Sequence, residues 1–247
     1  MSLLYLPAEF HLHTVLSACA EIEMIPPLII RQAQRLGIQW LAVTDHNSAE
    51  NARAVMEAGA RAGIAVLPGM EVQTREEVHL LCLFEALEPA LAWQEQVYQH
   101  LPDLPNREET FGSQLVVDAE GTFLRFQERL LQTSTSLSVE QVVTMVEALG
   151  GLVIPAHVDR PAFSLLANLG IIPPGLNIPA VEITPRLTPA QALERFPQLA
   201  GRALITNGDA HRLSEMRGRT LFRVAAPTLA ELRRALAGVD GRKVWVT

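Results

Sequence analysis

Short apolar runs alternate with amphipathic stretches along most of this chain. Such alternation is typical of repeated strand–helix units around a parallel sheet. The apolar runs predict strands at Glu9–Leu12, Gln39–Thr44, Ile64–Leu67, Val78–Phe84, Leu152–Ala156, Ala180–Ile183, Ala203–Thr206, Leu221–Val224 and Val244–Thr247. The regular alternation favours an α/β barrel of about seven strands over an open sheet, and periodicity alone does not decide between them.

Residues that start and stop helices flank the amphipathic stretches. Pro26 and Pro27 can open a helix that Gly37 ends, because proline suits a first helical turn and glycine suits the stop. Asn47 with Glu50 predicts the start of a second helix. The remaining predicted starts are the capping pairs Ser138 with Gln141 and Thr228 with Glu231.

The alternation breaks down between about Glu88 and Ser136. This stretch begins with a helical pattern, passes through a breaker-rich segment at residues 101–106, and then gives residues 116–121, which resemble a hairpin turn. We interpret residues 88–136 as an insertion into a single domain of residues 1–247. The insertion is expected to cover one end of the barrel, as a lid or a pocket-shaping segment.

The composition fits one large folded domain. Of the 247 residues, 49% are hydrophobic, so the chain can bury a sizeable core. No apolar run approaches the roughly 18 residues that span a bilayer, and the N-terminus lacks the basic flank of a signal peptide. The two cysteines, Cys19 and Cys82, cannot build a disulfide framework, which predicts a cytoplasmic protein.

The chain is acidic, with a formal net charge of −7 and an isoelectric point of about 5.5. It lacks the basic stripe that nucleic-acid-binding proteins usually carry, so we expect no long nucleic acid as partner. Bound divalent cations can reverse the sign of a local charge. The acidity therefore does not exclude a phosphorylated substrate.

Six of the seven histidines fall at predicted strand ends, each beside a carboxylate or another histidine; the seventh, His100, matches no motif. His11 and His13 stand two apart, and the two-residue period of a strand turns both rings to one face. Asp209 and His211 repeat this spacing near the end of the chain. The other members of the pattern are Asp45, His46, Glu71, His79 and His157.

Taken singly, each of these residues has a simpler explanation. A lone acid in a loop is more often a helix cap or a solvated group, and His79 and His157 could be hydrogen-bonded core histidines. Together, however, the residues lie at the C-terminal ends of different strands, where barrel enzymes gather their catalytic side chains. Burying so many polar groups without an ion would cost many kcal/mol, so the joint pattern predicts a metal cluster.

The motifs in this series resemble those of the PHP (polymerase and histidinol phosphatase) domain family of metal-dependent phosphoesterases. The matching blocks are His11-x-His13, Thr44-Asp45-His46, Gly69-x-Glu71 with His79, Ala156-His157 and Gly208-Asp209-x-His211. They occur in the family's order between about Glu9 and His211. The resemblance implies an α/β fold, a distorted (βα)7 TIM-like barrel, that binds two or three divalent ions, typically zinc, manganese or iron.

The resemblance also implies how the ligands are shared among the ions. The implied sets are His11, His13, Glu71 and Asp209 for a first ion; Glu71, His79 and His157 for a second; and His46 and His211 with a carboxylate or histidine from the loop after the first strand for a third. In this arrangement Glu71 bridges the first two ions.

Two positions depart from the family's pattern. The family usually has aspartate before the His-x-His motif, where this chain has Glu9. In the loop of residues 17–23, Glu21 is the best match for the remaining ligand of the third ion, because of its distance from Pro26. Cys19 and Glu23 are the alternatives.

The expected chemistry is in-line attack on phosphorus by a metal-activated hydroxide, because coordination lowers the pKa of water from about 15.7 towards 7. Asp45 is a candidate acid for the leaving oxygen, and could instead ligate a metal or orient His46. Arg160 can hold substrate phosphate with its planar guanidinium, or simply form a surface ion pair. Arg186 and Arg212 are weaker candidates for the same task.

Two other functions fit part of the pattern. Amidohydrolase barrels also open with His-x-His, but many of them bridge their metals with a carboxylated lysine, and the only lysine here, Lys243, lies outside the predicted site. A non-catalytic metal-binding or regulatory module would keep the ligands without turnover. For a phosphoesterase, the resemblance offers histidinol phosphate, nucleotide phosphates such as 3′,5′-bisphosphates, and oligonucleotide ends. The acidic composition favours a small phosphorylated molecule among them.

Overall fold

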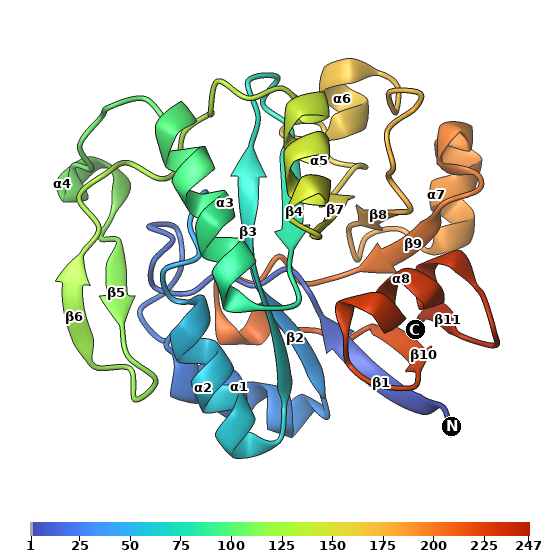
Figure 1. The fold of residues 1–247 in the computed structure, drawn as a ribbon, viewed down its shortest axis with the longest axis horizontal. Helices are drawn as coiled ribbons and strands as arrows, with labels where there is room; N and C mark the ends of the chain where they lie inside the picture. Colours follow the sequence, from blue (N-terminus) through green and yellow to red (C-terminus); the bar gives the residue numbers. More distant parts are fainter. Residues whose placement is uncertain (1) are drawn as a thin grey trace.

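The computed structural model describes residues 2–247 and shows a mixed α/β fold with a curled sheet (Figure 1). The strands are β1 (Leu4–Glu9), β2 (Trp40–Val43), β3 (Ala65–Gln73), β4 (His79–Leu83), β5 (Leu115–Val117), β6 (Phe123–Phe126), β7 (Leu152–Pro155), β8 (Ala180–Ile183), β9 (Ala203–Thr206), β10 (Thr220–Val224) and β11 (Lys243–Val246). The helices are α1 (Pro26–Leu36), α2 (Ala52–Ala62), α3 (Leu87–His100), α4 (Glu108–Phe111), α5 (Val139–Ala148), α6 (Leu165–Leu169), α7 (Pro189–Arg195) and α8 (Leu229–Ala237), with 3-10 turns at Pro197–Leu199 and Leu213–Glu215.

The main sheet has seven strands in the order β11-β10-β1-β2-β3-β4-β7. Within it only the β1–β2 and β2–β3 pairs are parallel, and the other four pairs are antiparallel. β8 and β9 form a separate parallel pair, with β8 packed beside β7 and β9 beside β11. The expectation of a parallel sheet is therefore wrong for most strand pairs, and closure into a (βα)7 barrel stays a prediction.

The first strand ends earlier than the sequence pattern predicts. β1 stops at Glu9, so His11 and His13 follow the strand instead of ending it. A single parallel bridge between Leu12 and Ala210 keeps this segment extended. The two histidines therefore keep the two-residue spacing that turns their rings to one face.

The third strand runs through the Pro68–Gly69 pair, where the sequence predicts a break. Pro68 pairs with β2, and from Gly69 onward the strand pairs with β4. A Cβ on Gly69 would lie 2.5 Å from the carbonyl oxygen of Cys82, so glycine permits this close approach. As a result, Glu71 lies on a rigid strand and not in a loop.

Helix termini follow the sequence signals only in part. α1 begins at Pro26 and ends at Gly37, whose φ of 69° suits glycine, and Ser138 forms the expected capping box of α5. The predicted cap of the second helix is wrong. α2 begins at Ala52, and the Asn47 side chain instead donates to two carbonyl oxygens of residues 131 and 133.

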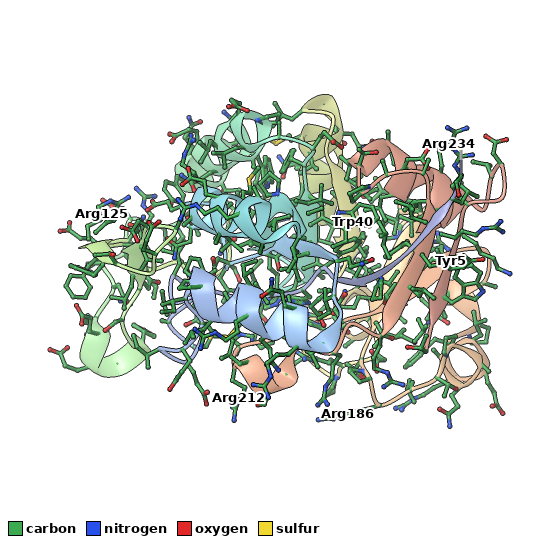
Figure 2. The ribbon with its side chains drawn as sticks, turned by 90° about the horizontal axis from the view of Figure 1, so that it is seen from below. Tyr5, Trp40, Arg125, Arg186, Arg212 and Arg234 are labelled. Atoms are coloured by element: carbon green, nitrogen blue, oxygen red, sulfur yellow. The ribbon has the colours of Figure 1, made fainter. Side chains whose placement is uncertain are left out.

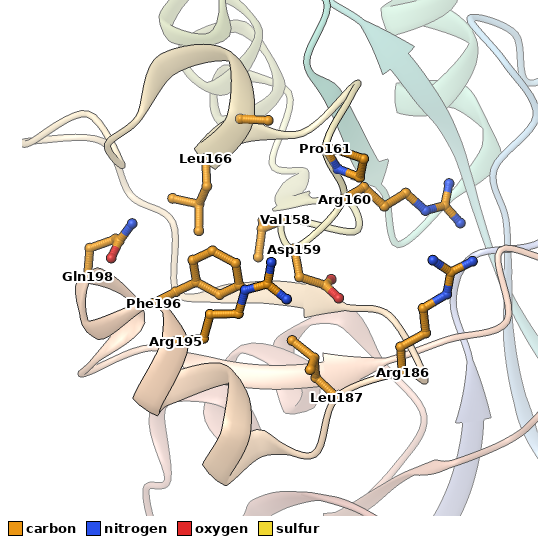
Figure 3. Close-up of a pocket in the computed structure, with 11 residues that line it drawn as sticks. Val158, Asp159, Arg160, Pro161, Leu166, Arg186, Leu187, Arg195, Phe196 and Gln198 are labelled. Carbon is orange, nitrogen blue, oxygen red and sulfur yellow. The ribbon is translucent and has the colours of Figure 1, made fainter.

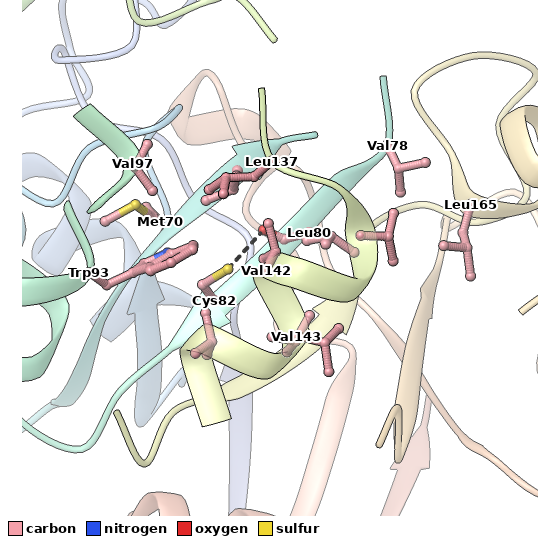
Figure 4. Packing of buried hydrophobic residues seen from close by; sticks show 14 of the residues in the cluster. Met70, Val78, Leu80, Cys82, Trp93, Val97, Leu137, Val142, Val143 and Leu165 are labelled. Carbon is pink, nitrogen blue, oxygen red and sulfur yellow. Dashed lines mark hydrogen bonds between the residues drawn. The ribbon is translucent and has the colours of Figure 1, made fainter. Parts of the chain in front are cut away.

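Three apolar clusters hold the sheet and its helices, and one of them packs α1 and α2 against β2. Another lies between β4, α3 and α5, where Met70, Cys82 and Trp93 pack together (Figure 4). The third draws side chains from eight strands together with α8, and contains Trp40 in edge-on contact with Phe10 at a centroid distance of 5.0 Å. These clusters fix the strand ends from which the site residues extend.

Residues 88–136 pack against the body of the domain. α3 packs against β3, and the β5–β6 hairpin lies near α2 (Figure 1). The Asn51 side chain donates to Leu115 O and accepts from Val117 N, each at 3.0 Å, while Leu115 N donates to Val15 O at 2.8 Å. The insertion thus supports the loop after β1, and its action as a lid stays a prediction.

Between residues 2 and 247, no helix combines the length and the apolar character needed to cross a bilayer.

Candidate metal centre

Two segments far apart in the sequence form the first part of the site. His13 N donates to Ala210 O, and Ala210 N donates to His11 O, both at 3.0 Å. This pairing brings Asp209 against the two histidines. Its Oδ1 atom lies 3.1 Å from His11 Nε2 and 3.3 Å from His13 Nε2.

Glu71 lies at the centre of the cluster and is only 1% exposed. Its carboxylate oxygens lie within 3.5 Å of nitrogen atoms from five histidines, which come from four different parts of the fold. The distances are 3.1 Å to His11 Nε2, 3.5 Å to His13 Nε2, 3.1 Å to His46 Nδ1, 2.9 Å to His79 Nδ1 and 3.2 Å to His157 Nε2. One strand residue thus joins the ends of β1, β2, β4 and β7.

Three groups of side chains lie close enough to share an ion, with ligand atoms within 4.8 Å of one another. They are His11, His13, Glu71 and Asp209; His46, Glu71 and His79; and His13, His46 and His211. The first group is the set that the sequence resemblance implies. The implied second set of Glu71, His79 and His157 is not one of the three groups. His46 joins Glu71 and His79 in its place, and His157 contacts Glu71 from the side of β7.

Buried atoms in the first group lack partners. Among residues 2–247, His11 Nε2, His13 Nε2 and Asp209 Oδ1 have no hydrogen bond. Leaving such atoms unsatisfied costs about 1–3 kcal/mol each. Atoms that bind one ion at about 2.0–2.2 Å lie roughly 3–3.5 Å apart, which matches the spacing of these three. Imidazole and carboxylate donors suit zinc, manganese or iron, so the residues fit the metal ions that the sequence implies.

The electrostatic balance of the cluster favours ionised acids. Burial raises the pKa of Glu71 and of Asp209, but the neighbouring histidines outweigh it and hold both pKa values well below their ordinary range. Burial and the nearby His211 hold the pKa of His13 well below 6.5. Burial also lowers the pKa of His11, but its three acidic neighbours raise it well above that value.

Glu182 is a site residue that the sequence analysis missed. It lies in β8, and both carboxylate oxygens lie 3.0 Å from His11 Nδ1. The same carboxylate accepts from His157 N at 3.0 Å and from Asn207 Nδ2 at 2.8 Å. Holding Nδ1 in this way turns His11 Nε2 toward Asp209 and Glu71. The available signal was a single acid inside a short apolar strand.

Glu9 is fully buried and lies apart from the candidate ligand atoms of the cluster. Its carboxylate accepts backbone hydrogen bonds from Gly208 at 2.7 Å, Arg217 at 2.9 Å and Gly218 at 3.2 Å. Burial raises the pKa of Glu9 to about 7. The residue therefore anchors the loop that carries Asp209.

Asp45 also faces away from the ligand atoms. Its oxygens accept from Thr14 N, Thr14 Oγ1 and Ser17 Oγ, each at 2.7 Å. Ser17 Oγ in turn lies 3.1 Å from His13 Nδ1. This geometry does not place the Asp45 carboxyl group beside a leaving oxygen or a metal ion, and it links Asp45 to the orientation of His13.

The loop after β1 presents Cys19, and not Glu21, to the cluster. The Glu21 side chain is 50% exposed, and its carboxylate lies 3.7 Å from Arg212 Nε. Glu23 is exposed as well. Burial raises the pKa of the Cys19 thiol, but hydrogen bonds with His211 and His46 outweigh it and lower that pKa to about 7.

The backbone is strained at two residues of the cluster, Asp209 and His157. Asp209 has a φ of 48° and His157 a φ of 31°, values that side-chain-bearing residues rarely adopt. At Gly208 a Cβ would lie 2.0 Å from the Glu215 carbonyl oxygen. Only glycine fits there, so the tight turn that aims Asp209 at the histidines depends on it.

Arginines surround the open side of the cluster. A cavity of about 550 Å³ is lined by Asp209, His211 and Cys19 together with Arg160, Arg186, Arg212 and Arg217. Arg160 Nη2 lies 2.6 Å from Asp209 Oδ2, and its side chain is 41% exposed. Arg160 and Arg186 also line an adjoining cavity, in which Figure 3 shows them side by side. Figure 2 shows Arg186 and Arg212 extending from the same side of the molecule.

Comparison with known proteins gives one matching family model and several solved structures with a similar fold. The family model of the PHP domain matches residues 9–131. The fold is similar to that of the lesion-specific endonuclease PfuEndoQ from Pyrococcus furiosus, with a TM-score of 0.72, 21% identity, and coverage of 98% of this chain and 58% of that one. It is also similar to a proposed metal-dependent phosphoesterase from Bifidobacterium adolescentis, with a TM-score of 0.57, 19% identity, and coverage of 83% and 87%. No protein with a curated description matches the sequence.

A further similar structure overturns the expectation that no long nucleic acid is a partner. It is Endonuclease Q in complex with a 27-mer duplex substrate that has an abasic lesion at the active site, with a TM-score of 0.70, 19% identity, and coverage of 97% of this chain and 58% of that one. Net charge sums over the whole surface, whereas an interface depends on local charge. Here the arginines gather beside the cluster, although the chain as a whole is acidic.

Proposed function

The chain belongs to the PHP domain family through residues 9–131, and from that premise we propose that it is a metal-dependent phosphoesterase. The observation that carries this proposal is the cluster around Glu71, in which buried lone pairs of His11, His13 and Asp209 converge without a hydrogen-bond partner. The chain spans 58% of the length of the two endonuclease structures, so their complete activities are not assumed for it.

In the proposed centre the ligands divide among two or three ions of zinc, manganese or iron. His11, His13, Glu71 and Asp209 hold the first; Glu71 with His79 and His157 holds the second; and His46 and His211 belong to the third. When bound, such ions lower the pKa of a coordinated water towards about 7 and so supply a hydroxide at neutral pH.

The protein's own residues position the substrate and the ligands. Arg160 reaches the cluster from the cavity side and can exchange its contact with Asp209 for one with a phosphoryl oxygen. Glu182 fixes the orientation of His11, and Asp45 holds the loop that carries Ser17 against His13. Asp45 is thus assigned a positioning task and not proton transfer.

The proposed substrate is a phosphate ester that enters through the arginine-lined cavity. Arg160 and Arg186 line both adjoining cavities, so a substrate anion can contact them while its scissile phosphate lies on the cluster. Small phosphorylated metabolites, nucleotides and nucleic-acid strands all share this chemistry. The experiment therefore has to compare monoesters with diesters.

The test is turnover of p-nitrophenyl phosphate and bis-p-nitrophenyl phosphate by protein stripped of metal and reloaded with manganese or zinc. We expect metal-dependent hydrolysis of at least one ester, reduced at least about 100-fold in His11→Ala. His100→Ala is the matched control, because His100 lies at the end of α3 and outside the cluster. Failure to hydrolyse either ester with any of these metals would leave the non-catalytic metal-binding module as the better description.

A further inference from the structure

The segment that follows β7 is a fixed platform beside the cluster. It runs from His157 to Ser164, the residue before α6. Arg160 N donates to His157 O at 2.9 Å, and Ser164 Oγ donates to Arg160 O at 2.8 Å. Ser164 also caps α6, because its Oγ accepts from Ala167 N at 3.1 Å. The backbone of this segment is therefore held at both ends, by β7 and by α6.

Phe163 is held over His79 by this segment. Phe163 O accepts from His79 N at 3.2 Å, and the two ring centroids lie 5.0 Å apart. Phe163 has a φ of 54°, in the left-handed region that is strained for a bulky side chain. The residue nevertheless remains 44% exposed. Burial of the ring thus does not account for a strained phenylalanine at this position.

Three histidine side chains of the cluster are accessible from the surface. They are His46 and His79, each 11% exposed, and His211, which is 23% exposed. The His46 ring is near both of the others, with its centroid 5.6 Å from that of His79 and 6.0 Å from that of His211. The three histidines thus form one accessible face of the cluster, and Phe163 adjoins this face at His79.

We propose that Phe163 binds the flat apolar part of the ester substrate. Arg160 meets the cluster at Asp209, with Nη2 2.6 Å from Oδ2, and Phe163 meets it at His79. When a phosphoryl group contacts the ions and Arg160, its ester substituent lies at the accessible face, where the exposed Phe163 ring can stack against an aromatic group. The inference rests on the proposed function and names its preferred substrates, esters whose alcohol carries an aromatic ring, such as an aryl or nucleoside group.

The test is calorimetric titration of the zinc-loaded, full-length protein with phenylphosphonate and with methylphosphonate, neither of which is hydrolysed. Stacking on one aromatic ring should raise the affinity for the phenyl compound about 5–10-fold relative to the methyl compound. We expect this preference in the wild type and in Phe163→Tyr, and its loss in Phe163→Ala. The affinity for methylphosphonate should be the same in all three proteins, because the phosphonate contacts the ions and Arg160.

Two further variants separate the ring from its backbone. Phe123→Ala is the matched control, because Phe123 is 49% exposed and lies in β6, where its ring is 4.8 Å from that of Phe126. Phe163→Gly should lose the aryl preference while keeping a melting temperature close to that of the wild type, because glycine adopts a positive φ without strain.

A ratio of the two affinities that is the same in wild type and in Phe163→Ala would overturn the inference. So would the absence of binding of either phosphonate to the zinc-loaded protein. The expected aryl preference without hydrolysis of either nitrophenyl ester would support the role of Phe163 and reject the proposed function. Hydrolysis with an unchanged affinity ratio would do the opposite.

Discussion

The Glu182 carboxylate connects three segments of the chain. It contacts the His11 ring, the backbone nitrogen of His157 and the side chain of Asn207, all within 3.0 Å. Asn207 Oδ1 in turn accepts from Phe10 N at 2.8 Å. A single buried acid therefore sets the direction of His11 Nε2 and also fixes the ends of the strands beside it.

Replacing Glu182 with glutamine should lower the affinity for the first metal ion by about 10–100-fold. The amide keeps the size of the side chain but loses the charge, and one of its two ends is a donor that cannot accept from His11 Nδ1. Zinc affinity measured by competition with a chromophoric chelator checks this expectation.

Glu194→Gln serves as the control for that measurement, because Glu194 is exposed on α7. Urea unfolding of both variants separates a loss of metal affinity from a loss of fold. Wild-type zinc affinity in Glu182→Gln would mean that His11 does not need this partner.

Individual site residues could be predicted where a polar side chain stands at the end of an apolar strand. His11, His13, Glu71 and Asp209 follow from such interruptions, and the structure brings them together. Glu182 escaped because its strand has only four residues and its acid looks like an outward-facing position. The choice of Glu21 as the remaining ligand rested on spacing alone, which does not show the direction in which a loop side chain points, and it stays a prediction.

The sequence predicts where the strands lie better than it predicts whether neighbouring strands run parallel or antiparallel. Most predicted strands exist, but the periodicity of side chains is the same in parallel and antiparallel pairs. The connection between β3 and β4 is residues 74–78, too short for a crossover, so only an antiparallel pair can form. The sequence analysis ended this strand at Leu67, so the short connection did not show in the pattern.

One acid joins the last three elements of the chain. Glu231 in α8 accepts from Ala225 N at 2.7 Å and from Arg242 Nε at 3.0 Å, so it ties the ends of β10 and β11 to the helix. The sequence predicts a reciprocal capping box with Thr228, but only the Thr228 half forms, because the carboxylate is engaged elsewhere. Its hydrogen bonds with Arg242 lower the pKa of Glu231 to about 2.

Replacing Glu231 with glutamine should reduce the free energy of unfolding at neutral pH by on the order of 1 kcal/mol, because its ion pair with Arg242 is partly buried but lies close to screening solvent. Since the pKa is lower in the folded state than its ordinary 4.5, the contribution is complete above about pH 4.5. It is lost as the pH falls towards 2. Urea unfolding at several pH values should show the difference between wild type and variant shrinking over that window. A difference that stays constant down to pH 2 would contradict this assignment.

Three buried acids lie among the histidines at the centre of the molecule. Glu71, Asp209 and Glu182 are held ionised by neighbouring histidines. Several of those histidines must be neutral in order to bind metal. When metal ions bind at the centre, they therefore replace protonated imidazoles as the source of positive charge. Metal binding at this buried centre should stabilise the folded state more than metal binding at a surface site would.

Metal removal should accordingly lower the melting temperature. An ion at 100 times its dissociation constant stabilises the folded state by about 2.7 kcal/mol. For a domain of this size that corresponds to roughly 5–10 °C. Calorimetry with zinc and with a chelator measures the shift in melting temperature. The His11→Ala variant should show only part of this shift, because the first ion, which His11 and Asp209 both bind in the proposal, loses one ligand. Identical melting temperatures with zinc and with chelator would show that the buried lone pairs of the cluster are satisfied by something other than a bound ion.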